Sequence, residues 1–345
     1  MEQLLKQIRR GITVVIILTV LLLGLSITLV FMRIIPKPTL FAKAEVPGKE
    51  NKKPQQPGTD SNTGIWKAPE ISLLKNKQEK ELVEYGRDLI ANTAKYFGPQ
   101  GVVGKLTNGM NCQNCHMDAG TKPFGNNYSA VYSTYPKFRA RSGTNESIVK
   151  RISDCFERSL NGIKPDSSSK EIKAMLAYIR FLGTEVKKGI VPKGAGLEKL
   201  AYLERAADPV KGKLIYQSKC ATCHGAAGAG LISEDKKSYT YPPLWGQNSY
   251  NDAAGLFRIS NFAGYVKNNM PFGASYENQI LSNEEAWDVA AFVNDQPRPH
   301  KDQQRDWVDL SKKPVDFPFG PYADKFTEMQ HKFGPYEPIK NSITK

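Results

Sequence analysis

The sequence predicts an all-α protein in which two tandem helical domains follow an N-terminal transmembrane helix and a disordered tether. Three observations predict this: a duplicated Cys-x-x-Cys-His motif, helical hydrophobic spacing around each copy, and an uncharged apolar run near the N-terminus. The 345 residues are enough for two or three domains. The net charge of +14 favours an acidic partner, an anionic substrate or a membrane surface. We expect no nucleic-acid partner, because no recognition motif or basic-aromatic module is present.

The N-terminus predicts a membrane anchor over residues 1–35. Ile12–Met32 is uncharged and long enough to span a bilayer. Lys6, Arg9 and Arg10 precede it, which favours a cytoplasmic N-terminus and places the rest of the chain on the periplasmic side. The alternative is a signal peptide cleaved near residues 42–44. The apolar run is longer than a signal core and charges follow it, so we favour an uncleaved anchor.

The rest of the chain divides by composition and motif. Residues 36–70 predict a flexible tether, because this stretch is rich in Pro, Lys, Gln and Asn and has little to bury. We expect a first domain over residues 71–190 and a second over residues 191–300. Residues 301–345 are expected to form a C-terminal extension that packs on both.

The duplicated motif predicts two covalently bound c-type hemes. Two thiols form thioethers with the porphyrin, and the next histidine binds the iron. A redox dithiol or a zinc site is the alternative, but a dithiol needs no histidine and a zinc site leaves the repeat unexplained. The heme-binding residues are therefore expected to be Cys112, Cys115 and His116 in the first copy, and Cys220, Cys223 and His224 in the second.

Each copy carries the element order of a class I cytochrome c domain. In the second copy a helix begins at Pro209, the heme motif follows, and a methionine loop leads to a closing helix. Ser282 and Glu285 predict a capping box at the start of that helix. In the first copy, helical spacing predicts an opening helix over residues 77–97 and a closing helix from Ser168 or Ser169 to Leu182.

The fifth cysteine, Cys155, stands where the first domain needs a second iron ligand. The closing helices share a pattern at Ala177 and Ala291, and Cys155 precedes the first at nearly the distance by which Met270 precedes the second. We therefore expect Cys155 to bind the first iron opposite His116, and Met270 to bind the second opposite His224. The alternatives are a buried free cysteine and a core methionine, with Lys267 as a competing ligand.

The neighbours of Cys155 favour a thiolate. Arg151 and Arg158 lie about one helical turn away on either side, and nearby cations lower the pKa of a thiol. A thiolate ligand lowers the reduction potential of a heme and a thioether raises it, so electrons are expected to run from the first heme to the second. The remaining free histidines, His300 and His331, are expected to be surface or packing residues.

Seven segments match one family of enzymes: Cys112–His116, Arg141–Gly143, Arg151–Gly162, Met175–Tyr178, Asn269–Pro271, Phe317–Asp324 and Gln330–Pro335. Through these segments the chain resembles the diheme thiosulfate dehydrogenases and tetrathionate reductases. The resemblance implies that two thiosulfate ions are joined to tetrathionate at the His/Cys-ligated heme, or the reverse. It further implies that Arg141, Arg151 and Ser159 hold the anion and that Cys155 leaves the iron to attack or carry sulfur. The second heme would exchange electrons with an external redox partner.

Other functions stay open at this point. A membrane-tethered diheme electron carrier would have two ordinary His- or Met-ligated hemes, whereas Cys155 stands at one ligand position. A Sox-type sulfur-linking cytochrome would share the Cys-ligated heme but need a separate partner subunit. A peroxidase-like protein would need an open or His-ligated heme. The predicted anchor leaves the redox partner open between a cytochrome and a membrane respiratory component. Asn269 stands where some members of the resembled family carry a lysine before the methionine.

Overall fold

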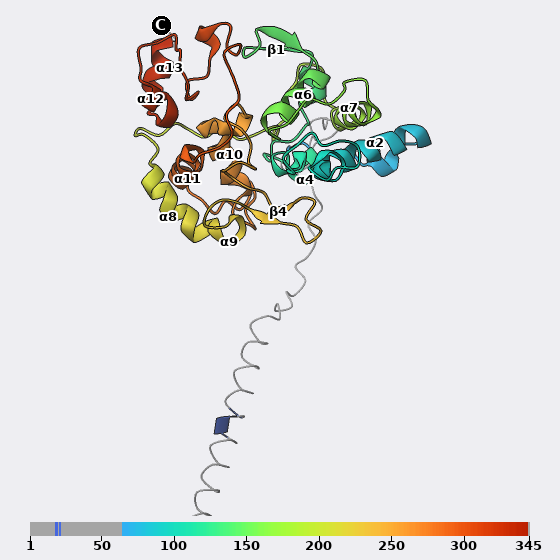
Figure 1. Ribbon diagram of the computed structural model, residues 1–345, viewed down its shortest axis with the longest axis horizontal. Helices are drawn as coiled ribbons and strands as arrows, with labels where there is room; N and C mark the ends of the chain where they lie inside the picture. Colours follow the sequence, from blue (N-terminus) through green and yellow to red (C-terminus); the bar gives the residue numbers. More distant parts are fainter. Residues whose placement is uncertain (1–17, 20, 22–63, 344–345) are drawn as a thin grey trace, which may run out of the picture. The chain divides into compact units, whose positions relative to one another are not determined.

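The computed structural model describes residues 18, 19, 21 and 64–343 (Figure 1). The predicted anchor, apart from three residues, and most of the predicted tether lie outside this range. Within the described residues, no helix has the length and apolar character needed to cross a membrane. Residues 64–343 belong to one compact unit with two hydrophobic cores, one for each heme motif.

The first core is enclosed by helices that flank the first motif. The predicted helix over residues 77–97 is in fact two helices, because Asn92 leaves the helical region of backbone space (φ −122°, ψ 40°). Asn76 caps the first of them by accepting a hydrogen bond from the N–H of Glu79. The helices are α2 (Lys77–Ala91), α3 (Thr93–Phe97), α4 (Met117–Gly120), α5 (Val131–Thr134), α6 (Ile148–Arg158) and α7 (Lys170–Leu182), with 3₁₀ turns η1 (Ile71–Leu73) and η2 (Cys112–Asn114).

The second core repeats this plan. Ser282 and Glu285 form the predicted capping box at the start of its closing helix. Its opening helix begins with Pro209 behind the cap Asp208, whose carboxylate accepts from two backbone N–H groups. The helices are α8 (Pro209–Lys219), α9 (Ala221–His224), α10 (Ile259–Asn269) and α11 (Asn283–Asp295), with the 3₁₀ turn η3 (Gly255–Phe257).

The opening and closing helices of each domain cross at a glycine. A Cβ atom on Gly86 of α2 would lie 2.0 Å from the carbonyl oxygen of Ala174 in α7. A Cβ atom on Gly212 of α8 would lie 1.9 Å from the carbonyl oxygen of Asp288 in α11. No side chain fits at such distances, so both crossings depend on the absence of a Cβ. The same solution at the same place in both domains supports the repeat inferred from the motifs.

The protein is mostly helical rather than all-α. Strands β1 (Lys137–Arg139) and β2 (Thr144–Glu146) form one antiparallel pair, and β3 (Leu231–Ile232) and β4 (Tyr239–Tyr241) form another. The first pair turns through Gly143, whose φ of +65° favours glycine. Both pairs are too short to show a strand period in the sequence, which is why helical spacing alone predicted no strand.

The C-terminal segment packs on both domains. It contains η4 (Leu310–Lys312), α12 (Glu328–Phe333) and α13 (Glu337–Ile343). Phe333, Tyr336 and Ile339 join the second core, and Asp316 binds Arg258 at the start of α10. Toward the first domain, Asp306 binds Arg158 at the end of α6. Figure 1 shows α12 and α13 beside the second domain, with the chain before them passing near α6.

The glycine crossings generate a prediction. Gly86→Ala and Gly212→Ala should each destabilise the protein by about 1–3 kcal/mol, because the new methyl group forces the helices apart. Thermal unfolding followed by far-ultraviolet circular dichroism measures the effect. Gly255→Ala is the control, since a Cβ there meets no atom within 4 Å. Equal unfolding temperatures for all three variants would contradict the crossing argument.

Candidate heme and substrate site

The second motif opens onto a cavity of about 620 Å³. Cys220, Cys223, His224 and Met270 all line it, so the predicted attachment residues and both predicted iron ligands face one space. The Nδ1 of His224 lies 2.9 Å from the carbonyl oxygen of Pro242. When Nδ1–H donates to that carbonyl, the ring is fixed and its Nε2 is left free for a metal. This donor set and the mainly apolar lining fit a c-type heme.

The first motif lines a second cavity, of about 170 Å³. Cys112, Cys115 and His116 contribute to its wall together with Cys155. The Nδ1 of His116 lies 2.5 Å from the carbonyl oxygen of Asn126, as in the second motif. Burial lowers the pKa of His116 to about 4, so the ring is neutral at physiological pH and can bind a metal. These residues also fit a heme.

The two cavities share part of their walls. Asn111 and Cys115 line both, so some of the space beside the first motif belongs to the larger cavity. Burial raises the pKa of the free Cys112 and Cys115 thiols to about 12, which keeps these thiols protonated before attachment. The shared wall places the two heme sites next to each other.

Helix α6 carries the fifth cysteine into the first cavity. The Ser147 side chain accepts from the N–H of Lys150 and so starts the helix. Arg151 and Cys155 are four residues apart, which puts them on one face, and both line the cavity. The negative charge of a Cys155 thiolate raises the pKa of Arg151. Among the described residues, the Arg151 side chain makes no hydrogen bond or ion pair, so its guanidinium is available to an anion.

The three residues predicted to hold the anion do not all line the first cavity. Ser159 lines the first cavity with Arg151 and Cys155, but Arg141 is not among its lining residues. The Nη1 of Arg141 donates to the carbonyl oxygen of Ala253 at 2.6 Å, and its guanidinium lies 5.2 Å from the centre of the Trp307 ring. Burial lowers the pKa of Arg141 to about 9. The structure therefore holds Arg141 in contacts of its own.

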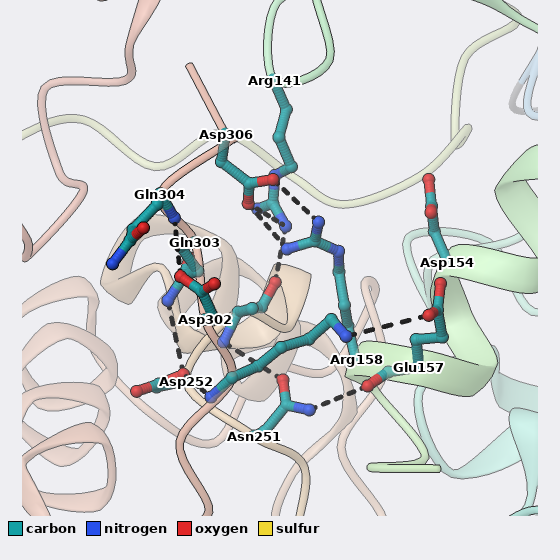
Figure 2. A network of polar contacts seen from close by, with 12 residues as sticks. Arg141, Asp154, Glu157, Arg158, Asn251, Asp252, Asp302, Gln303, Gln304 and Asp306 are labelled. Carbon is teal, nitrogen blue, oxygen red and sulfur yellow. Dashed lines mark hydrogen bonds and ion pairs between the residues drawn. The ribbon is translucent and has the colours of Figure 1, made fainter. Parts of the chain in front are cut away.

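Arg158 points to a residue that sequence reasoning missed. Its two terminal nitrogens donate to both carboxylate oxygens of Asp306, at 2.7 and 2.9 Å, and Asp306 also lies 3.8 Å from Arg141 (Figure 2). Asp306 is 148 positions away from Arg158 and belongs to no motif. Nothing in the sequence joins the two, because only the folded C-terminal segment brings the carboxylate to α6.

The structure also places the possible competing ligand Lys267 and the two histidines outside the heme motifs. Lys267 is buried and donates to the carbonyl oxygen of Leu281, and it does not line the cavity that holds His224 and Met270. His331 is buried against the Tyr322 ring, with its nitrogens facing Val315 and Asp324. His300 is exposed and contacts Asp252.

Comparison with protein families matches both domains. Residues 209–297 match the cytochrome c family, and residues 104–187 match the SoxA/TsdA cytochrome c domain. Two cytochrome c domains imply two covalently bound hemes c and an extracytoplasmic location. These matches agree with the heme interpretation of both motifs and give no support to a dithiol or zinc site.

Comparison with individual proteins narrows the family. The chain is 38% identical over 235 residues to a thiosulfate dehydrogenase of Allochromatium vinosum, covering 67% of this chain and 83% of that protein. It is 34% identical to a thiosulfate dehydrogenase of Stutzerimonas stutzeri, covering 71% and 76%. The solved structure of the thiosulfate dehydrogenase (TsdBA) of Marichromatium purpuratum aligns with a TM-score of 0.64 and 28% identity, covering 75% of this chain and 54% of that one. The chain therefore belongs to the thiosulfate dehydrogenase family of diheme c-type cytochromes.

Proposed function

We propose that this diheme cytochrome c oxidoreductase joins two thiosulfate ions into tetrathionate, with release of two electrons. The observation that carries the proposal is the common cavity of His116, Arg151, Cys155 and Ser159. It brings together an imidazole that can bind a metal, a thiol, a hydroxyl and a guanidinium that has no hydrogen bond or ion pair among the residues the structure describes. Thiosulfate is a small dianion with a nucleophilic outer sulfur, and this set of groups suits it.

The residues of the first cavity would have separate roles in the reaction. Arg151 attracts the dianion and lowers the cost of burying it, and the Ser159 hydroxyl donates a hydrogen bond to a sulfonate oxygen. His116 and Cys155 would hold the first iron, and the Cys155 sulfur is the group that meets the substrate. In the sulfur-transfer step, a bond forms between the Cys155 sulfur and the outer sulfur of one thiosulfate as two electrons leave. A second thiosulfate then attacks that outer sulfur, which releases tetrathionate and restores the thiolate.

Bound hemes would supply one-electron acceptors for these two electrons. The shared wall at Asn111 and Cys115 supports direct passage from the first site to the second. In the second site, we propose that His224 and Met270 hold the iron and that an external cytochrome or membrane respiratory component takes the electrons.

We further propose two class I cytochrome c-like domains over residues 71–190 and 191–300. Residues 1–35 would tether them to the periplasmic side of the membrane through residues 36–70.

The activity has a direct test. The purified protein should reduce ferricyanide in the presence of thiosulfate and produce tetrathionate in a two-to-one ratio of thiosulfate consumed to tetrathionate formed. Tetrathionate-dependent oxidation of a reduced dye, measured on the same sample, gives the reverse rate. A protein with both hemes attached that is inactive in both assays would instead be an electron carrier.

Cys155 can be tested separately. Cys155→Ala should change the absorption and electron paramagnetic resonance spectra of the first heme only, and it should abolish turnover, because the iron loses its thiolate ligand. Pyridine hemochrome analysis should still find two hemes, since Cys155 is not an attachment residue. A variant carrying Cys220→Ser and Cys223→Ser should retain one. An unchanged spectrum in Cys155→Ala would remove this residue from the iron.

Arg151, which lines the first cavity, and Arg141, which does not, should differ in their effect on thiosulfate binding. Arg151→Gln should raise KM for thiosulfate roughly tenfold or more, as expected for loss of a charge-assisted contact. Arg141→Gln should have a smaller effect on KM, because the Arg141 guanidinium is already engaged by the Ala253 carbonyl and Asp306. Steady-state kinetics at fixed ionic strength measures both. The reverse order would assign the anion contact to Arg141.

A further inference from the structure

The last turn of α6 is held by a loop of the second domain. Asn251 supplies two donors: its backbone N–H lies 3.2 Å from the carbonyl oxygen of Arg158, and its side-chain amide lies 2.9 Å from that of Glu157. The same amide lies 3.0 Å from the side-chain oxygen of Asn161. The final carbonyls of a helix have no partners within the helix, so such external donors are what keep the last turn from fraying.

The C-terminal segment holds the same turn from another direction. Asp306 engages Arg158 through two parallel hydrogen bonds, and the two side chains are 10% and 13% exposed. A bidentate pair with this burial fixes direction as well as distance. A carboxylate beside a helix C-terminus is unfavourable by itself, and the guanidinium of Arg158 between them reverses that effect.

The loop that carries Asn251 and the C-terminal segment that carries Asp306 also bind each other. Asp252, next to Asn251, accepts from the backbone N–H of Lys301 at 3.0 Å and from the Gln303 amide at 3.3 Å. Lys301 in turn lies 3.8 Å from the Glu157 carboxylate on α6. Figure 2 shows the resulting closed network, in which the second-domain loop, the C-terminal segment and α6 all meet.

Cys155 belongs to the turn that this network holds. Its carbonyl oxygen accepts from the N–H groups of Ser159 at 2.9 Å and Leu160 at 3.0 Å, so the backbone of Cys155 moves with the end of the helix. We propose that Asn251 and Asp306 are positioning residues for Cys155, through which the second domain and the C-terminal segment together set the position of the sulfur in the first heme site. The proposal rests on the proposed binding of Cys155 to the first iron.

This assigns the second domain a task besides electron transfer. The first domain supplies the thiol, and Asn251 of the other domain adds donors to the Glu157 and Arg158 carbonyls at the end of its helix. Small displacements of a reacting group reduce rates strongly. A sulfur on a frayed turn would sample several distances from the iron, and both ligation and sulfur transfer would lose precision.

The test uses the full-length protein with both hemes attached. Asn251→Ala removes the side-chain donor, and Asp306→Asn removes the charge on the bidentate pair while keeping its shape. Asn261→Ala is the matched control, because it removes a side-chain hydrogen bond to the Gly255 carbonyl within the second domain and leaves the contacts of α6 unchanged. Asp306→Glu tests rescue by a conservative change. Three readouts apply: the spectra and potential of the first heme, hydrogen exchange of residues 148–160, and kcat against KM.

We expect Asn251→Ala and Asp306→Asn to broaden the first heme's low-spin resonance, to shift its potential, and to speed exchange in residues 148–160. The kcat should fall on the order of tenfold to a hundredfold with KM much less changed, as expected for a misplaced reacting group. The second heme's spectrum and the Asn261→Ala variant should stay like the parent, and Asp306→Glu should recover part of the loss.

Two outcomes separate this inference from the proposed function. If Cys155→Ala alters the first heme and both positioning variants leave its spectrum and potential unchanged, the positioning role is wrong and the ligation stands. If Cys155→Ala leaves the first heme unchanged, the ligation itself is wrong. Should Asn251→Ala fail to fold, the isosteric Asp306→Asn decides the result by the same readouts.

Discussion

The structure depends on one arrangement: a thiol and a guanidinium that share a face of a single helix inside a heme cavity. Arg151 and Cys155 are four residues apart on α6 and line the same space as His116. The charge of a Cys155 thiolate raises the pKa of Arg151, so the guanidinium keeps its charge inside the cavity. Around this pair, the other contacts of α6 decide where the helix ends and which of its groups face the cavity.

The two domains show how a duplicated fold acquires different chemistry. Both cross their first and last helices at a glycine and both direct a histidine Nδ1 to a backbone carbonyl. These shared features fix the porphyrin-binding frame. The domains differ in the side chain proposed as the second iron ligand: the first cavity has the Cys155 thiol beside Arg151, and the second has Met270 in a mainly apolar wall. One side chain therefore separates the proposed reaction site from the proposed relay.

Much of this was predictable, because it is local. The heme motifs have fixed spacing, and the cap at Ser282 and the closing helices follow from neighbouring residues. The break at Asn92 and the short strand pairs carry no period and escaped prediction. Arg141 was expected in the anion site, but its side chain contacts Ala253 and Trp307, which are distant from it in the sequence. Asp306 was missed for the same reason, since such contacts exist only after the domains have packed.

The wall that the two cavities share at Asn111 and Cys115 has a kinetic meaning. Two separate cytochromes must find each other by diffusion, so their exchange slows on dilution and responds to salt. Here the donor and acceptor sites adjoin within one chain, and transfer between them is a first-order event whose rate is independent of protein concentration. Dilution and ionic strength then act only on the entry of the substrate anion and on the final exchange with an outside partner.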